Sequence, residues 1–311
     1  MAHEFEIVSY GETNFKIFMV NMLYRTPHIH KDFELGLVLN GAINLITQGQ
    51  VIPLWQGDFL LMNPFQSHEL KADHPALVLT VQVPSAFFSS YYKPIESLEF
   101  ITSRFQKSEN TPAYESLITM FLNLAHEYFS RSQFFEIKCA SMLNQCFLTL
   151  LQVMEHRFIS EKERLASKAK ATRMRSILRY IDDHYSEKLL LSDVARQEQL
   201  SLYYLSHLFK DAFGISFQDY LLRIRCEKAR QLLLLTNQSL IDVCIACGFS
   251  DPKYFNHGFK KQYHCTPKEY RKQFYHEESA TQQKSVLTTQ KFLPFDTSLE
   301  MLSTINMDKL Y

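Results

Sequence analysis

Four side chains of types that bind metals or polar ligands lie in the N-terminal quarter of the sequence. His28 and His30 alternate along a predicted β-strand, so both imidazoles point to one face, and Glu34 has the same parity. His68 follows after later turns. Three imidazole nitrogens and one carboxylate oxygen could hold a divalent metal such as zinc, iron or manganese. The same residues could form a metal-free pocket for a polar ligand, which we expect, or could be purely structural.

Aromatic residues nearby could complete such a pocket. Trp55, Phe59 and Phe65 could stack on or enclose a sugar or a small acid, although Trp55 could equally belong to the core. We expect no cofactor and no metal. The expected effector-binding residues are His28, His30, Glu34, Trp55 and His68.

The C-terminal region contains an internal repeat, which is the most specific signal in the sequence. A shift of 50 residues places Ser201–Lys210 on Asp251–Lys260 and aligns tyrosine, histidine, phenylalanine and lysine. Each copy predicts a short helix, a tight turn and a second helix, which is the helix-turn-helix pattern. A helix predicted over Phe217–Leu235 joins the copies. At 1.5 Å per residue it spans roughly 28 Å, which could hold two reading helices about one turn of DNA apart.

Helical periodicity separates the core from the exposed face of each predicted second helix. Leu205, Leu208 and Phe209 fall on one side of the first copy, and Phe255 and Phe259 do so in the second. We expect Ser192, Ser201 and Asp251 to be helix N-caps. The opposite faces would meet DNA through Leu202, Tyr203, Ser206, His207 and Lys210 in the first copy and Lys253, Asn256, His257, Lys260 and Lys261 in the second.

Charge is balanced in total, with 33 basic and 33 acidic residues, but it is unevenly distributed. Lys168–His276 contains 18 Lys and Arg against 11 Asp and Glu, and the rest of the chain contains 15 against 22. A basic region beside an acidic one indicates a polyanionic partner such as nucleic acid, or simply an uneven solvated surface.

The composition is that of a folded protein with about two domains. The 311 residues are 46% hydrophobic and 21% charged, which excludes disordered and fibrous classes. No apolar stretch reaches the ~18–20 residues of a membrane span, and no basic secretory signal opens the chain. Six cysteines do not indicate a disulfide framework, and we expect Cys244 and Cys247 to be buried rather than to bind zinc. We expect a cytoplasmic protein without membrane contact.

The chain divides into five expected segments. Short strands separated by Gly and Pro turns predict a barrel, and long helical stripes follow them. The segments are a barrel over 1–110, helices over 111–159, a linker over 160–175, the repeat over 176–275 and a mobile tail over 276–311.

The helices over 111–159 have two apolar stripes. One could pack on the barrel while the other pairs with a second subunit, and we expect a homodimer; packing within one chain is the alternative. The stripes are Leu117, Phe121, Leu124 and Tyr128, and Ile137, Met142, Cys146, Leu150 and Val153.

Residues 175–274 resemble the AraC/XylS family of bacterial transcription regulators. The resemblance rests on Leu191–Ala195, Ser201–Lys210 with Gly214, Gly248–Asp251, Tyr254–Lys261 and Thr266–Arg271. It implies a seven-helix, two-motif unit that binds promoter DNA, usually activates transcription and works with RNA polymerase. Three residues depart from the family pattern, namely Gln199 and His264 in place of glycine and Cys244 in place of alanine.

The resemblance also implies roles for single residues on the two exposed faces. Neither histidine among them can make the bidentate pair that arginine makes with guanine, so we expect less guanine-biased reading. The positions that match base readers are Tyr203, Ser206, His207, Lys253, Asn256 and His257, and the lysines 210, 260 and 261 are expected phosphate contacts.

Residues 25–83 resemble a cupin. The pattern is His-x-His-x3-Glu-x6-Gly ending at Gly41, followed by Gly57-Asp58 and by Pro64-x3-His68, with Met22 in place of an upstream glycine. AraC-like sensor barrels generally keep this pattern while binding an organic effector without metal.

We therefore expect an α+β multi-domain chain with an N-terminal cupin-like β-barrel and flanking helices, and a C-terminal all-α domain with two helix-turn-helix motifs. The expected function is effector-controlled transcription regulation rather than enzymatic catalysis. The alternatives are a metal-dependent cupin enzyme with a helical appendage, and a regulator with an empty barrel that responds to dimerisation or to a protein partner.

Overall fold

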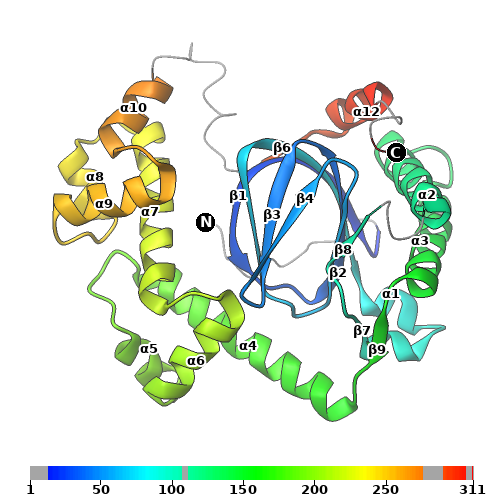
Figure 1. Ribbon diagram of the computed structural model, residues 1–311, viewed down its shortest axis with the longest axis horizontal. Helices are drawn as coiled ribbons and strands as arrows, with labels where there is room; N and C mark the ends of the chain where they lie inside the picture. Colours follow the sequence, from blue (N-terminus) through cyan, green and yellow to red (C-terminus); the bar gives the residue numbers. More distant parts are fainter. Residues whose placement is uncertain (1–12, 107–110, 276–289, 306–309, 311) are drawn as a thin grey trace. The chain divides into compact units, whose positions relative to one another are not determined.

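The computed structural model describes residues 13–106, 111–275, 290–305 and 310. They fall into two compact units. The barrel unit contains the described residues up to Ala171 together with those from Gln290 onward, and the helical unit contains those from Thr172 to 275. The two units together have the expected α+β composition, since the strands lie in the barrel unit and the helical unit is all helix (Figure 1).

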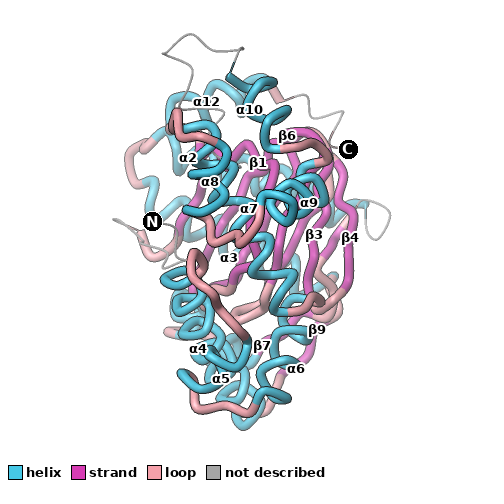
Figure 2. Tube along the Cα trace, turned by 90° about the vertical axis from the view of Figure 1, so that its left-hand side faces the viewer, coloured by secondary structure: helices cyan, strands magenta, loops and turns pink. Residues whose placement is uncertain are grey.

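The barrel unit is built on an antiparallel sheet that curls into a nearly closed barrel (Figure 2). Neighbouring strands follow the order β10-β1-β6-β2-β5-β8, while β3 pairs with both β6 and β4. The strands are β1 (Lys16–His28), β2 (Asp32–Asn40), β3 (Ala42–Thr47), β4 (Gln50–Trp55), β5 (Phe59–Met62), β6 (His68–Pro84), β8 (Arg104–Phe105) and β10 (Gln290–Phe292), and β7 (Leu98–Phe100) pairs separately with β9 (His156–Phe158).

Both faces of strand β2 are buried, and its period of two separates two cores. Its odd-numbered residues, such as Phe33 and Leu35, pack in a cluster shared with the flanking helices. Its even-numbered residues, such as Val38, pack in a second cluster inside the barrel. Gly36 also lies on the inner face, where an added Cβ would meet Leu60 Cγ at 2.7 Å. The interior at this level is therefore filled by side chains.

Helices cover the outer face of the sheet. They are α1 (Ser85–Ser89), the 3-10 helix η1 (Lys93–Ser97), α2 (Thr111–Ser130) and α3 (Phe135–Val153). The first predicted stripe, which includes Leu117 and Phe121, is buried against the sheet. Fully burying such a side chain contributes about 1.5–3 kcal/mol. From the second stripe, Cys146 and Leu150 are also buried within the chain, whereas Ile137 is 71% exposed.

The prediction of a mobile tail over 276–311 is wrong for residues 290–304. Strand β10 pairs with the edge strand β1, with Val20 opposite Phe292. Helix α12 (Phe295–Thr304) then packs beside α2 (Figure 1), where Phe295 contacts Tyr128 and Phe129. The chain therefore returns to the barrel unit after the helical unit; residues 276–289 lie outside the described part.

All but the first residue of the expected linker over 160–175 lies within one helix, α4 (Glu161–His184), which contains the division between the units at Ala171. The helical unit continues with α5 (Leu191–Gln197), α6 (Leu202–Phe213), α7 (Phe217–Leu235), α8 (Leu240–Ala246), α9 (Pro252–Tyr263) and α10 (Pro267–Tyr275). Ser192 is not the N-cap of α5: the helix begins at Leu191, two residues earlier than expected, its N-cap is Leu190, and the Asp193 carboxylate accepts the Leu190 N–H at 3.0 Å.

Candidate functional site

Helices α6 and α9 present the same pattern of exposure. Residues 201–211 and 251–261 match position by position, with four exposed, one buried, two exposed, two buried and two exposed. Leu205, Phe209, Phe255 and Phe259 are the buried aromatic and aliphatic anchors, at 0–2% exposure. All ten residues expected to meet DNA are exposed on these two helices, so both helices offer a polar surface of the predicted composition.

The turn before each of these helices needs a left-handed residue. Gln199 has φ +55° in the first motif and Gly248 has φ +75° in the second. These two residues are 49 positions apart, whereas the N-caps Ser201 and Asp251 are 50 apart, so the second turn is one residue longer. Both expected caps are confirmed, because Ser201 Oγ accepts the Tyr204 N–H and Asp251 accepts the Lys253 N–H.

Helix α9 is fixed to α7 by close packing and by a hydrogen bond to a buried ion pair within α7. Gly258 stands where the first motif has Leu208, and an added Cβ would lie 2.6 Å from Leu222 Cδ1. Arg230 donates two hydrogen bonds to the Glu227 carboxylate at 2.8 and 3.0 Å. Tyr263, at the end of α9, donates to the same carboxylate at 2.7 Å. These contacts orient the second reading helix against the long central helix.

One expected phosphate contact has a partner within the chain. Lys261 Nζ lies 3.2 Å from Asp219 Oδ1, which joins α9 to α7. Both side chains are largely exposed, so the pair contributes little to stability. Lys210 and Lys260 lie in the last turns of α6 and α9 and are exposed.

In the barrel unit, the sheet register brings the predicted histidines together. His28 at the end of β1 lies opposite His68 at the start of β6, and their ring centroids are 4.1 Å apart. Glu34, on the inner face of β2, places one oxygen 3.0 Å from His30 Nε2 and the other 4.0 Å from His68 Nε2. The four side chains are at most 5% exposed, and their ligand atoms lie within 4.8 Å of one another.

Backbone carbonyls orient all three imidazoles. The Nδ1 atoms of His28, His30 and His68 lie 3.0, 2.9 and 3.1 Å from the carbonyl oxygens of Thr26, Asp32 and Gln66. A carbonyl only accepts hydrogen bonds, so each Nδ1 carries a proton and donates it. In a neutral imidazole this leaves the Nε2 lone pair for a ligand, which is the usual arrangement of metal-binding histidines.

The protonation states favour a bound cation. Burial lowers the pKa of His28 well below its ordinary value, and burial lowers the pKa of His68 to about 4. Burial alone would raise the pKa of Glu34, but the hydrogen bond with His30 and the charges of His30 and His68 lower it to about 2, helped by a hydrogen bond from Gln82. A buried carboxylate needs a compensating positive charge, and a cation held by the same side chains would supply it.

The structure does not bring two of the predicted aromatic walls, Trp55 and Phe59, to this cluster, whereas the Phe65 N–H donates to the His30 carbonyl at 2.8 Å. Trp55 pairs with Ala42, at the end of the β3–β4 hairpin opposite to Thr47, which pairs with His68. Trp55 therefore lies five residues along the hairpin, about 17 Å, from His68, and it is 52% exposed. Phe59 points outward and packs against Phe121 of α2. These two residues therefore do not lie beside the histidines, because the first lies too far along the hairpin and the second faces the opposite side of the sheet.

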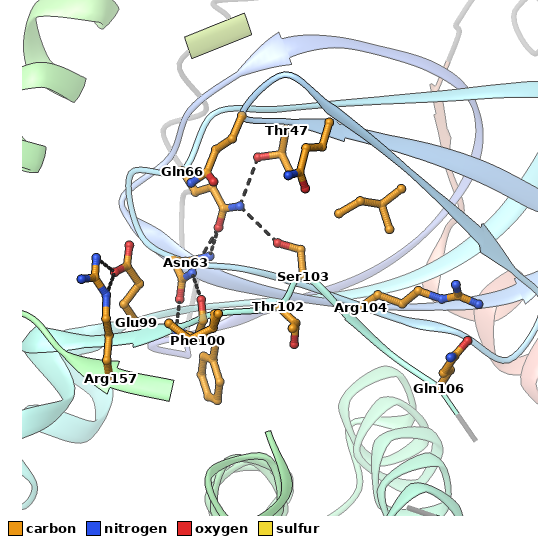
Figure 3. A pocket seen from close by; sticks show the side chains of 14 residues that line it. Thr47, Asn63, Gln66, Glu99, Phe100, Thr102, Ser103, Arg104, Gln106 and Arg157 are labelled. Atoms are coloured by element: carbon orange, nitrogen blue, oxygen red, sulfur yellow. Dashed lines mark hydrogen bonds and ion pairs between the residues drawn. The ribbon is translucent and has the colours of Figure 1, made fainter. Parts of the chain in front are cut away.

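Two cavities in the barrel unit were not predicted from the sequence. One, of about 610 Å³, lies beside the β3–β4 hairpin and is lined mainly by amide and hydroxyl side chains (Figure 3). The other, of about 390 Å³, is lined in part by Phe65 and by Lys168 of α4. The concentration of glutamines near the hairpin tip, Gln48 and Gln50, is a signal that could have indicated the first.

Two known protein families match the chain, one in each unit. The AraC-like ligand binding domain matches residues 19–136, and a helix-turn-helix domain matches residues 194–273. The chain therefore combines an AraC-like ligand binding domain with a helix-turn-helix domain.

Two individual relatives each match about a third of the chain. Regulatory protein PocR of Salmonella typhimurium is 42% identical over 102 residues, 33% of this chain and 34% of PocR. The HTH-type transcriptional activator RhaR of Mannheimia succiniciproducens is 33% identical over 103 residues, 33% of this chain and 37% of RhaR. The chain thus spans about a third of the length of these relatives. Among solved structures, the C-terminal domain of the response regulator yesN from Fusobacterium nucleatum is 42% identical and covers 32% of this chain and 98% of that domain, with a TM-score of 0.31.

The departures from the AraC/XylS pattern lie away from the exposed faces. Gln199 and His264 both adopt positive φ, as glycine would, and Cys244 is buried beside Phe249. Burial also raises the pKa of Cys247, to about 12, as expected of a small core residue rather than of a reactive thiol. Within the described ranges, no helix combines the length and apolarity required to cross a bilayer.

Proposed function

We propose that this chain is a sequence-specific DNA-binding transcription regulator, an activator controlled by an effector bound in its barrel unit. The observation that carries the proposal is the matched exposure of α6 and α9 in one compact unit. Two such helices joined by the 19-residue helix α7 suit successive major grooves on one face of a duplex. The relatives named as regulators and activators support the same function.

The exposed faces divide into base-reading and phosphate-binding residues. Lys210 and Lys260 are placed to neutralise phosphates and so to fix the register on DNA. Lys261 would reach a phosphate by exchanging its partner Asp219. The proposed base readers are Tyr203, Ser206 and His207 on α6, and Lys253, Asn256 and His257 on α9.

Selection from a pool of random duplexes tests the DNA-binding function. The full chain should enrich a consensus with two conserved blocks about one helical turn apart, and a reporter placed behind that sequence should respond to the protein with RNA polymerase. A pool that remains random after repeated selection at moderate salt would contradict the proposal. The proposed site of action is the cytoplasm, as for a protein that meets bacterial DNA.

We propose further that the cluster of His28, His30, Glu34 and His68 holds a divalent cation. The cluster is too tight and too buried for a sugar, because its ligand atoms lie within 4.8 Å of one another. Three nitrogens and one carboxylate oxygen suit zinc, iron or manganese, and His68 Nε2 makes no hydrogen bond to any described residue. The ion would join β1, β2 and β6 at this end of the barrel. We propose a regulatory rather than a catalytic role, in line with the named relatives.

Metal analysis of the purified full chain tests the cation site. The wild type should retain close to one equivalent of metal after dialysis, and His68→Ala should lose it. His74 provides a matched control, because it is an exposed histidine on the same strand. Equal metal contents in His68→Ala and His74→Ala would show that the cluster holds no ion.

We propose that α3 forms the contact between two copies of the chain. An exposed seam with alternating spacings of three and four residues runs along it, as in a pair of packed helices. Phe134, Ile137 and Leu148 on this seam are 63%, 71% and 56% exposed. Its exposed members are Phe134, Ile137, Ser141 and Leu148, and its partly buried members are Asn144 and Leu151.

Light scattering on the full chain tests the dimer. Ile137→Glu should yield monomers, whereas Leu165→Glu, at an exposed leucine of α4, should remain dimeric. A wild-type protein that is monomeric at micromolar concentration would contradict this proposal.

A further inference from the structure

The larger cavity of the barrel unit is a built polar site that is separate from the histidine cluster. Its volume of about 610 Å³ lies within the range of small-molecule pockets. The four residues of the histidine cluster do not line it. It is formed by the β3–β4 hairpin, the turn after β5 and the segment from β7 to β8 (Figure 3).

Hydrogen bonds within the protein fix the polar groups on one wall. The Gln66 amide donates to Thr47 Oγ1 at 3.1 Å and to Ser103 Oγ at 3.2 Å. Its oxygen accepts two hydrogen bonds from Asn63, which is itself held by the backbone of Phe100. Figure 3 shows this chain of contacts along the cavity. The wall is therefore preorganised, which lowers the entropic cost of binding a ligand.

The charged side chains at the cavity are neutralised in pairs. Arg157 binds Glu99 at 2.5 Å, and Arg104 binds Asp58 at 2.9 Å. The guanidinium of Arg104 also lies over the ring of Trp55, 5.0 Å from its centroid. A cavity with paired charges offers no net charge to anchor a carboxylate or a phosphate.

The remaining groups are both donors and acceptors. No described residue makes a hydrogen bond with the amide of Gln106 or with the hydroxyl of Thr102, and both line the cavity. Amide and hydroxyl side chains can both donate and accept hydrogen bonds. They therefore suit a ligand whose hydroxyl groups also donate and accept hydrogen bonds. Ile52 supplies an apolar surface for C–H groups.

We propose that this cavity binds a neutral, hydroxyl-rich molecule of sugar size and is the effector site of the chain. The inference rests on the proposed regulatory function. Gln66 connects the cavity to the histidine cluster, because its side chain lines the cavity while its carbonyl accepts the hydrogen bond from His68 Nδ1 at 3.1 Å. Thr47 likewise lines the cavity, pairs with His68 in the sheet and donates to the Ser67 carbonyl at 2.7 Å. A ligand that forms hydrogen bonds with the side chains of Gln66 and Thr47 therefore acts directly on the residues that position His68.

Calorimetric titration of the full chain tests the site. The probes are neutral pentoses, hexoses, deoxyhexoses and inositol, with gluconate and glucose 6-phosphate as charged counterparts. At least one neutral probe should bind saturably, and the charged ones should bind at least tenfold more weakly. Gln106→Ala should raise the dissociation constant of that probe about five- to tenfold. Gln145→Ala, at an exposed glutamine of α3, should leave it unchanged.

Three outcomes would overturn the inference: no saturable binding of any neutral probe, equal binding of the charged probes, or equal effects of the two glutamine variants. Selection of DNA by the same preparation separates this failure from failure of the proposed function. A chain that enriches a DNA consensus but binds no neutral probe remains a regulator with its effector elsewhere. A chain that enriches no DNA contradicts the regulatory function whatever the cavity binds.

Discussion

The turn of the first helix-turn-helix motif predicts a stabilising substitution, Gln199→Gly. Gln199 has φ +55°, whereas the second motif has Gly248 at the equivalent position with φ +75°. A side chain in the left-handed region costs roughly 1–2 kcal/mol. Glycine avoids this cost, but its greater freedom in the unfolded chain lowers the stability by about 0.5–1 kcal/mol. The net expectation is a gain of about 0.5–1 kcal/mol in the free energy of unfolding of the helical unit.

Thermal unfolding of the full chain, followed by far-ultraviolet circular dichroism, measures this gain. A change of 1 kcal/mol moves the midpoint of a small domain by about 4–8 °C, so the transition of the helical unit should rise by about 2–8 °C. The matched control is Gly248→Ala. Its Cβ would lie 2.7 Å from backbone atoms of Tyr185 and Ser186, which cannot move aside, so its midpoint should fall. An unchanged or lower midpoint for Gln199→Gly would refute the strain argument.

The remaining predictions concern DNA contacts, one hydrogen bond of the helical unit and the exposure of the cysteines. His257→Ala should weaken binding to the selected DNA sequence about tenfold while changing binding to random DNA less than twofold. Lys260→Ala should instead weaken binding to both DNAs and reduce the salt dependence of the binding affinity by about 0.9 units of slope. If His257→Ala weakens binding to both DNAs equally, His257 is not a base reader. Tyr263→Phe should cost about 1–2 kcal/mol in urea unfolding, because it removes a hydrogen bond to the Glu227 carboxylate, and an unchanged midpoint would show that this bond does not hold α9. A thiol reagent should label at most one of the six cysteines in the native chain, the half-exposed Cys265, and all six in urea; rapid native labelling of a second cysteine would contradict the burial described above.

Local patterns predicted much of the candidate sites. Strand alternation fixes the side on which a residue lies, so His28, His30 and Glu34 could be placed on one face from parity alone. Helical periodicity likewise identified the buried anchors Leu205 and Phe255. Both rules act over a few residues and need no knowledge of the tertiary structure.

The parts that the sequence did not predict depend on distant contacts. How tightly the histidines converge is set by the register between β1, β2 and β6. Trp55 was expected beside the histidines, but the composition of a hairpin does not indicate which of its two ends lies near them. Strand β10 has only three residues, too few for a periodic signal, and it forms because β1 offers it an edge.

The return of the chain to β1 constrains how this protein can be shortened. A gene truncated after the codon for Tyr275 would encode an intact second motif but would leave β1 without its neighbour β10 and α2 without its neighbour α12. The bared backbone edge and the uncovered rings of Tyr128 and Phe129 would invite self-association. Fragments intended to study effector binding in isolation therefore need residues 290–305 joined back by a designed linker, and an excised barrel that precipitates would reflect a missing edge strand rather than an inability to fold.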